Sequence, residues 1–75
     1  MIHIGKIIEE ELRSQERTVA WFARKLLCDR GTVYSIFQRQ SINTDVLLQI
    51  SKILNRNFFE LYISELDDEC GKRAT

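Results

Sequence analysis

The stretch from Thr18 to Arg39 contains the residues of this chain best suited to bind another molecule. We predict that it forms two short helices joined by a tight turn. The second of these helices is predicted to expose a face of polar and small residues, namely Arg30, Gly31, Thr32, Tyr34, Ser35 and Gln38. A helix with such a face, held out from the rest of the domain, is suited to lie in the major groove of DNA.

The length and composition of the chain favour a single all-helical domain. A chain of 75 residues is expected to form one domain. Hydrophobic residues make up 44% of it and charged residues 29%, both ordinary for a globular protein. The sequence has no proline and three glycines, fewer turn signals than a β-sandwich or barrel needs. So small a domain also leaves little room for a cavity that holds a substrate and a cofactor.

Positive and negative charges are separated along the chain, although the formal net charge is zero. Residues 13–39 contain six basic and two acidic residues, a net charge of +4. Residues 64–75 contain four acidic and two basic residues, a net charge of −2. The zero total disfavours nucleic-acid binding, whereas a local basic face attracts phosphates.

The residue types give little support to other kinds of chemistry. Cys28 and Cys70 lie far apart in the sequence and are expected to stay reduced. A single histidine and no Cys-x-x-Cys pair predict no metal site. No nucleophile stands beside a base, so we expect no enzymatic activity and no cofactor. No apolar segment approaches the ~18 residues of a membrane span and the first residues lack a signal-peptide pattern, which favours a cytoplasmic, nucleoid-associated protein.

Hydrophobic periodicity and capping residues predict five helices. Thr18 and Asp29 are expected to cap the two helices of the central stretch, because their side-chain oxygens can accept from first-turn amides. Asn43 or Thr44 is expected to cap the next helix, and Asn55 to end it in a left-handed conformation. The first four helices are predicted near residues 2–13, 19–26, 30–37 and 44–54. Their inward residues are predicted to be Ile4, Ile7, Ile8, Leu12, Val19, Phe22, Ala23, Leu26, Val33, Ile36, Phe37, Val46, Leu47, Ile50, Ile53 and Leu54.

The last predicted helix, near residues 58–66, has more apolar residues than one buried face needs. Asn57, followed by Glu60, resembles a capping box at its start. The residues expected to pack inward are Phe58, Leu61 and Tyr62, and those left over are Phe59, Ile63 and Leu66. We interpret the second set as a dimer patch, because exposed apolar surface often marks an interface; completion of the core is the alternative. Residues 1–66 then form the domain, and residues 67–75 a flexible acidic tail.

The spacing of these residues is similar to that of a known family in three segments. The first covers the paired helices: Thr18-x-x-x-Phe22-Ala23-x-x-Leu26-x-Cys28-Asp29-Arg30-x-Thr32-Val33-x-x-Ile36-Phe37. The second covers the fourth helix: Ser41-Ile42-x-Thr44-x-x-Leu47-Leu48-x-Ile50-Ser51-x-Ile53-Leu54. The third opens the fifth: Phe58-Phe59-Glu60-Leu61. Over about residues 4–66, the chain thus resembles the helix-turn-helix proteins of the phage repressor and Cro type, also called the xenobiotic-response-element class.

This resemblance implies a compact, all-α, repressor-like domain of five helices with a helix-turn-helix at the second and third. It also implies a sequence-specific binder of double-stranded DNA, commonly a transcriptional repressor of bacterial or phage type and often a homodimer. By position, Arg30, Gly31 and Ser35 fall where such proteins contact base edges, with Thr32 beside them. An arginine in the first exposed turn can reach guanine O6 and N7 with both arms of its guanidinium.

The resemblance also implies contacts to the DNA backbone. Thr18 and the amide of Val19 fall where the start of the second helix meets a phosphate, and Gln38 and Arg39 fall near a second phosphate contact. Further candidates are Arg13, Arg17, Arg24 and Lys25, from their charge, and Tyr34, from its phenolic hydroxyl.

Three positions depart from the family pattern. Leu27 occupies a turn position that the family usually fills with glycine, so it must avoid or tolerate a left-handed backbone. Gly31 lies inside the predicted recognition helix, where it lowers helix propensity and offers no side chain. Ala20 and Trp21 replace polar residues on the outer face of the second helix. With the zero net charge and acidic tail, Gly31 favours a second interpretation, a protein-interaction module such as an antitoxin or adaptor on the same fold.

Overall fold

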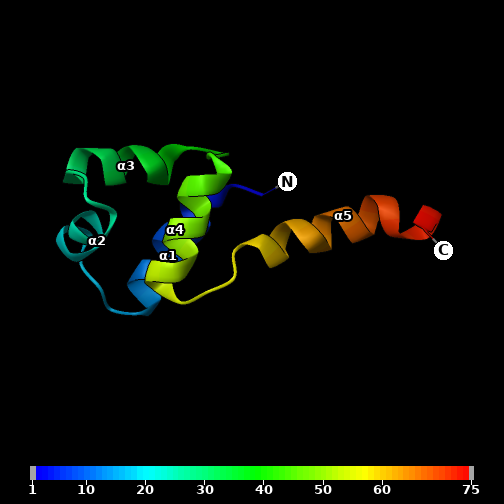
Figure 1. Ribbon diagram of the computed structural model, residues 1–75, viewed down its shortest axis with the longest axis horizontal. Coiled ribbons are helices and arrows are strands. Elements are labelled where there is room, and N and C mark those ends of the chain that lie inside the picture. Colours follow the sequence, from blue (N-terminus) through cyan, green and yellow to red (C-terminus); the bar gives the residue numbers. More distant parts are fainter. Residues whose placement is uncertain (1, 75) are drawn as a thin grey trace.

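A computed structural model of the chain describes the backbone of residues 2–74 and the side chains of residues 2–66. It contains five α-helices (Figure 1): α1 (Ile4–Ser14), α2 (Val19–Leu26), α3 (Arg30–Gln38), α4 (Thr44–Leu54) and α5 (Phe59–Ala74). No strand occurs in this part of the chain. The prediction of an all-α fold with five helices is therefore confirmed. The molecule measures 45 × 20 × 19 Å because four helices form a bundle and α5 projects from it.

The polar residues before the helices determine where they begin. The hydroxyl of Thr18 accepts a hydrogen bond from the Trp21 amide at 3.0 Å and caps α2. A carboxylate oxygen of Asp29 accepts from the Thr32 amide at 2.8 Å and caps α3. Of the two residues predicted as possible caps of α4, Asn43 and Thr44, the structure shows that Asn43 is the cap. These bonds satisfy amides that a helix leaves without carbonyl partners in its first turn.

The first helix begins two residues later than predicted because His3 caps it. The Nδ1 atom of His3 accepts from the Lys6 amide at 3.2 Å, and the helix starts at Ile4. Histidine is an unusual cap, so the sequence pattern placed it inside the helix instead.

Among residues 2–74, three residues other than glycine adopt positive φ, namely Glu16, Leu27 and Asn55, with angles of 57°, 58° and 54°. Asn55 follows α4, which confirms the predicted left-handed stop. Leu27 follows α2 and adopts a left-handed conformation that glycine accepts more readily than leucine. Its side chain is 92% exposed, so the conformation brings it no contact in the core.

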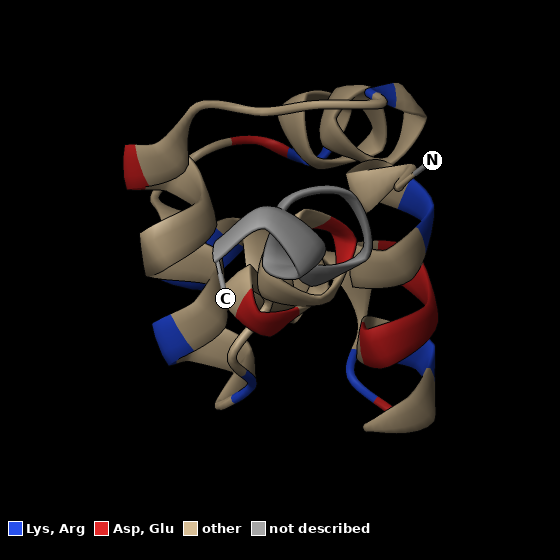
Figure 2. Ribbon diagram, turned by 90° about the vertical axis from the view of Figure 1, so that its right-hand side faces the viewer, with Lys and Arg blue, Asp and Glu red and all other residues tan. Residues whose placement is uncertain are grey.

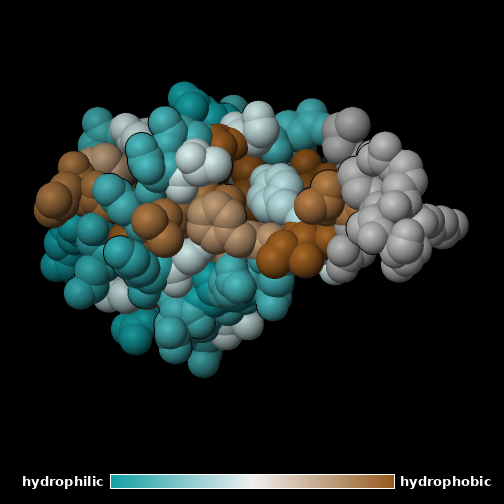
Figure 3. All heavy atoms as spheres, turned by 45° about the vertical axis from the view of Figure 1, so that its right-hand side comes forward, coloured by the Kyte–Doolittle hydropathy of each residue, from teal (hydrophilic) through white to brown (hydrophobic). Residues whose placement is uncertain are grey.

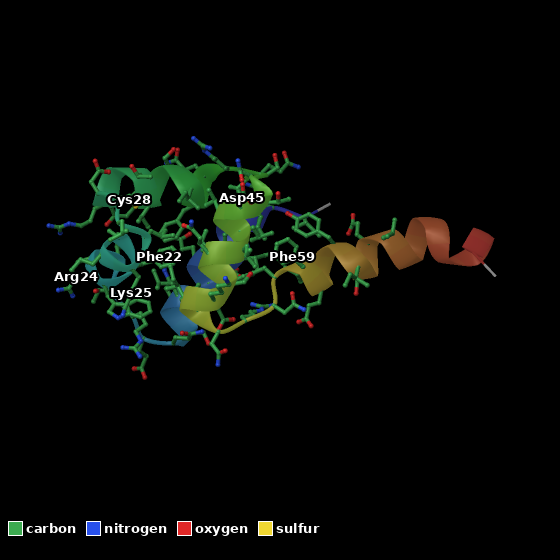
Figure 4. All side chains as sticks on the ribbon, viewed as in Figure 1. Phe22, Arg24, Lys25, Cys28, Asp45 and Phe59 are labelled. Carbon is green, nitrogen blue, oxygen red and sulfur yellow. The ribbon has the colours of Figure 1, made fainter. Side chains whose placement is uncertain are left out.

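The core is made of the predicted apolar faces of α1 to α4. Phe22 points from α2 into the centre of the bundle (Figure 4) and is fully buried. The other buried apolar residues are Ile4, Ile8, Leu12, Ala23, Val33, Ile36, Phe37, Leu47, Ile50, Leu54 and Phe58. The remaining residues predicted to point inward in these helices, Ile7, Val19, Leu26, Val46 and Ile53, are partly buried against this core.

The start of α1 and the end of α3 are in direct backbone contact. The amide of Gly5 donates to the Arg39 carbonyl at 3.0 Å, and the amide of Ile4 donates to the Gln40 carbonyl at 3.2 Å. A Cβ atom at Gly5 would lie 2.6 Å from the carbonyl carbon of Phe37 and overlap the carbonyl oxygens of Ile36 and Phe37. Glycine at this position therefore allows the backbone of α1 to hold the C-terminal end of α3 in place.

The last helix packs on the bundle mainly through its beginning. Phe58 is buried just before α5, and Phe59 and Leu61 are partly buried against the core. The expectation for Tyr62 is wrong, since its side chain is 38% exposed where α5 leaves the bundle. The helix runs to Ala74 rather than ending near Leu66. We predicted a flexible acidic tail over residues 67–75. The side chains of these residues lie outside the described part of the structure, so this stays a prediction.

Within the described residues, no helix is both long enough and apolar enough to cross a lipid bilayer.

Candidate nucleic-acid interface

The second and third helices form a helix-turn-helix unit. Only Leu27, Cys28 and Asp29 separate them, and the amide of Cys28 donates to the Ala23 carbonyl at 3.0 Å, which tightens the turn. Figure 1 shows α3 lying across the page with α2 below it, seen nearly end-on, so the two helices cross steeply. The rings of Phe22 and Phe37 stack at 6.5 Å between centroids and join the pair from inside. Two helices crossed in this way through a short turn are the helix-turn-helix arrangement.

One face of α3 is free of the bundle. Successive residues turn by about 100° around a helix axis. With Val33, Ile36 and Phe37 buried, the residues opposite them are Gly31, Ser35 and Gln38, all exposed. The flanks of this exposed face, which we call the α3 face, are Arg30 and Tyr34 on one side and Thr32 on the other, and all three are also exposed. The structure thus brings the predicted base-contact residues onto one surface.

Small side chains occupy the middle of the α3 face. Gly31 has a helical backbone without positive φ, so its conformation does not require glycine. A Cβ atom at this position would have as its nearest neighbour the Oδ1 atom of Asp29 at 3.5 Å, an ordinary van der Waals distance. Neither the backbone nor the packing of the free domain therefore explains glycine here. A flat centre allows another surface to approach the helix backbone closely.

Two arginines stand at the N-terminal end of the α3 face. Arg30 and Arg24 line a shallow depression between α2 and α3, together with Ala20, Ala23, Cys28 and Asp29. Figure 4 shows Arg24 on the outer side of α2. Arg24 was predicted only as one of several basic residues that could contact phosphates, and the fold places it beside Arg30. The side chain of Ala20 in this lining is small and exposed.

The hydroxyl of Thr32 is already engaged in the cap of α3. It donates to the Asp29 carboxylate at 2.9 Å, beside the amide bond from the same residue. Thr32 can therefore contact a base only through its methyl group or by accepting a hydrogen bond at its hydroxyl oxygen. The backbone bond from Thr32, and secondly the hydroxyl bond, lower the pKa of Asp29.

This capping contact predicts how the stability of α3 depends on pH. The pKa of Asp29 is lower in the folded state than in the unfolded chain. The charged carboxylate therefore stabilises the fold above the ordinary aspartate pKa, and this stabilisation is lost as the pH falls through the pKa of the folded state. The Asp29→Asn variant keeps a capping oxygen without the charge. We expect wild type to melt at a higher temperature than this variant at pH 7. In thermal melts followed by circular dichroism, the difference should shrink below about pH 3.9, the usual aspartate pKa, and vanish at lower pH. A constant difference would contradict the assignment.

The predicted phosphate-contact residues lie at the two ends of the helix pair. Thr18 is exposed, and its oxygen accepts from Trp21 while its hydroxyl hydrogen stays available to donate. The side chain of Val19 packs against the core, and its amide belongs to the first turn of α2. At the other end, Gln38 and Arg39 are exposed where α3 stops.

Arg17 and Tyr34 each have a partner inside the domain. The guanidinium of Arg17 lies 4.6 Å from the centre of the Trp21 ring, and the ammonium of Lys25 lies 5.9 Å from the same ring. Tyr34 is 53% exposed and contacts Phe37 edge-on, with centroids 6.2 Å apart. Its ring is thereby positioned on the flank of the α3 face.

The first helix contributes residues that sequence reasoning missed. His3, Lys6 and Glu9 line a depression together with Tyr34 and Gln38 of α3. Lys6 is exposed and adds a positive charge beside the C-terminal half of α3. Glu9 shares this edge, where a negative charge would repel the phosphates of any bound DNA. Its carboxylate is paired with Arg13 at 2.9 Å, which offsets part of its charge.

Figure 2 shows the acidic residues of α1 on one flank of the bundle, opposite α4. Glu11 is bonded to Arg56 at 2.8 Å and ties α1 to the segment after α4. These acidic side chains therefore serve contacts within the bundle.

Cys28 is unsuited to nucleophilic chemistry. Burial and, secondly, the negative charge of Asp29 raise the pKa of its thiol. The thiol therefore keeps its proton near neutral pH, whereas the thiolate is the reactive form.

Two of the three residues predicted for a dimer patch are exposed. Ile63 and Leu66 are 54% and 57% exposed on α5. Phe59 is partly buried against the core, so only part of its side chain is open to solvent. Figure 4 shows Phe59 at the junction of α4 and α5. Leu48 and Tyr62 are further large hydrophobic residues with exposed side chains.

Comparison of the chain with protein-family models, with curated proteins and with solved structures finds no match.

Proposed function

We propose that this protein is a sequence-specific binder of double-stranded DNA that acts as a transcriptional regulator, most simply a repressor, in the cytoplasm. Its α3 enters the major groove, and α2 lies across the sugar-phosphate backbone. The observation that supports this proposal is the uncovered α3 face, flat at Gly31 and Ser35 and bordered by Arg30. Arg24 beside it supplies a second positive charge at the end of the helix pair that would face phosphates.

The proposal assigns each predicted residue a contact. Arg30 and Ser35 contact base edges, Gly31 lets the helix backbone approach them, and Thr32 offers its methyl group. The backbone contacts come from Arg17, Thr18, Val19, Tyr34, Gln38 and Arg39. Regulation follows from occupancy of the site, with no cofactor and no catalytic step.

The glycine in the α3 face gives a prediction with opposite effects on stability and binding. Alanine fits at Gly31 without a clash and is favoured over glycine in a helix by about 1 kcal/mol. We expect Gly31→Ala to raise the melting temperature by roughly 4–8 °C and to weaken binding of the selected DNA site, because the added methyl group holds the helix away from the bases. Thermal melts and fluorescence anisotropy with labelled duplex measure the two quantities. Unchanged binding would show that nothing approaches Gly31 closely.

The direct test of the proposal is DNA binding as a function of salt. Oligonucleotides selected from a random pool provide the duplex and show whether the bound sequence has half-site symmetry. A protein that neutralises several phosphates should lose orders of magnitude in affinity between ~50 and ~200 mM salt. Binding that is absent at low salt, or insensitive to salt, would reject the proposal.

A second candidate function is a protein-interaction module on the same helices, such as an antitoxin or adaptor. The formal net charge of zero favours it, and so does Glu9, whose carboxylate borders the α3 face. Absence of duplex binding in the salt series is the outcome that supports this alternative.

We also propose that the protein acts as a homodimer through the exposed apolar side of α5, with Phe59, Ile63 and Leu66 at the interface. Two copies on a palindromic site would present two α3 helices to successive major grooves, about 34 Å apart.

A further inference from the structure

We propose that α5 of one copy docks into a groove between α2 and α4 of a second copy. This groove, called here the α2–α4 groove, is lined by Lys25, Leu26, Leu27, Gln49, Lys52 and Ile53. The inference rests on the proposed self-association and identifies the surface that α5 meets.

Leu27 at the rim of the groove has no role within the domain. Its side chain is 92% exposed, and its backbone is left-handed with φ of 58°. A left-handed backbone is unfavourable for a residue with a Cβ atom, and an exposed leucine gains nothing from burial to offset it. Glycine or asparagine would serve the turn better. Leucine at this position is explained if its side chain becomes buried against another molecule.

The α2–α4 groove is positively charged around its apolar lining. Lys25 and Lys52 stand on its two walls, and no acidic residue lines it. Among the described residues, the ion pairs are Arg13–Glu9 and Arg56–Glu11, so neither lysine is neutralised by a carboxylate there. The groove therefore fits a segment that is both apolar and acidic.

The projecting part of α5 has this complementary character. Tyr62, Ile63 and Leu66 are exposed and form a strip along the helix, with Glu65 on its flank next to Tyr62. Tyr62 and Glu65 also border a depression that is lined on its other side by Ile2, Gln40 and Ser41 of the same chain. The neighbouring Glu60 is also exposed, and residues 60–66 include no basic residue. An amphipathic helix that lays its apolar side into a groove is a common mode of protein recognition.

The arrangement of the two surfaces requires a second copy. The α2–α4 groove lies near one end of the 45 Å molecule, and α5 projects at the other end, so α5 cannot reach the groove of its own chain (Figure 1). Figure 3 shows hydrophobic side chains on one face of the molecule, at the bundle end and along α5. Two copies laid face to face in opposite directions place each α5 over the groove of the other. The contact then forms twice and closes a two-fold dimer.

Charge reversal on each side of the contact tests the proposal in the full chain without DNA. Sedimentation equilibrium measures the dimer dissociation constant of wild type, Lys52→Glu and Glu65→Lys. Each reversed chain carries two repulsive contacts per dimer, so we expect each dissociation constant to rise about tenfold or more. An equimolar mixture of the two variants restores an attractive charge pair at both contacts, so it should dimerise like wild type.

The outcomes separate this proposal from its rivals. If the Lys52→Glu variant dimerises with the same dissociation constant as wild type, the groove contact is overturned. It is also overturned if wild type remains monomeric at millimolar concentration. If only Glu65→Lys loses dimerisation, and the mixture of the two variants does not restore it, α5 of one copy pairs with α5 of the other. Leu27→Gly removes the strain of the left-handed turn, so it should raise the melting temperature at concentrations where the chain is monomeric. The same variant should weaken the dimer. A higher melting temperature with an unchanged dimer dissociation constant also overturns the proposal. Duplex binding by dilute protein is measured separately, so its failure would be seen independently.

Discussion

Replacing Gly5 with alanine is expected to destabilise the domain by about 2–3 kcal/mol. The added Cβ atom would overlap the carbonyl oxygens of Ile36 and Phe37, which are backbone atoms and cannot turn away as a flexible side chain can. The amide of Gly5 would then be pushed from the Arg39 carbonyl, which it now meets at 3.0 Å. For a domain of this size, the expected fall in melting temperature is roughly 10–20 °C, measured by calorimetry or circular dichroism.

Gly31→Ala is the matched control for this experiment, because both variants add one methyl group to a helical glycine. The first glycine is enclosed by backbone, and the second faces open space apart from Asp29. Helix propensity alone would make both variants more stable. Equal gains in melting temperature at the two positions would therefore show that α1 and α3 are not in contact at Gly5.

Replacing Arg30 with alanine is expected to weaken binding to the preferred DNA site by about 5- to 150-fold, equivalent to 1–3 kcal/mol. Arg30 is exposed in the first turn of α3, where it can bond to a guanine through both arms of its guanidinium. The loss should be concentrated at one base pair, because Arg30 reads that pair. Competition with a panel of single-base variants of the site measures it. The melting temperature should stay near that of wild type, since the side chain does not enter the core.

Two further arginines provide controls for this prediction. Arg39→Ala, at the other end of α3, should weaken all sequences by a similar factor and reduce the salt dependence, as loss of a phosphate contact does. Arg13→Ala removes the same charge from the last turn of α1, at the far end of that helix from α3 (Figure 1). It also leaves Glu9 without its ion-pair partner, so any loss of affinity from this variant should be the same for all sequences. If all three variants lose the same affinity for every sequence, the effect is one of overall charge and Arg30 does not read a base.

The helix-turn-helix could be predicted closely because its signals are local. Thr18 and Asp29 cap the helices that follow them by accepting from amides three residues away, and such contacts depend little on the rest of the chain. The buried faces of α2 and α3 were predictable for a related reason, since apolar residues at helical spacing must turn toward one another to leave water. Exposure of the α3 face followed from the same pattern.

The last helix was harder to predict, because its surroundings depend on where it leaves the bundle. Phe59 and Tyr62 are both aromatic residues of α5, yet Phe59 packs against the core and Tyr62 is exposed. Periodicity assigns faces to a helix but does not say how far along its length a neighbour extends. The bundle ends beside the first turn of α5, so the side chains of residues 62–66 are exposed.

The amino-acid order alone was enough for the number of helices, the caps of α2 and α3 and the polar face that we propose to contact DNA, because each depends on interactions within one or two turns. Tertiary structure decided the rest. It set Gly5 against the end of α3, placed Arg24 beside Arg30, and separated the α2–α4 groove from α5 by the length of the molecule. These arrangements join residues distant in sequence, and their geometry comes from how whole helices pack, which no local pattern contains.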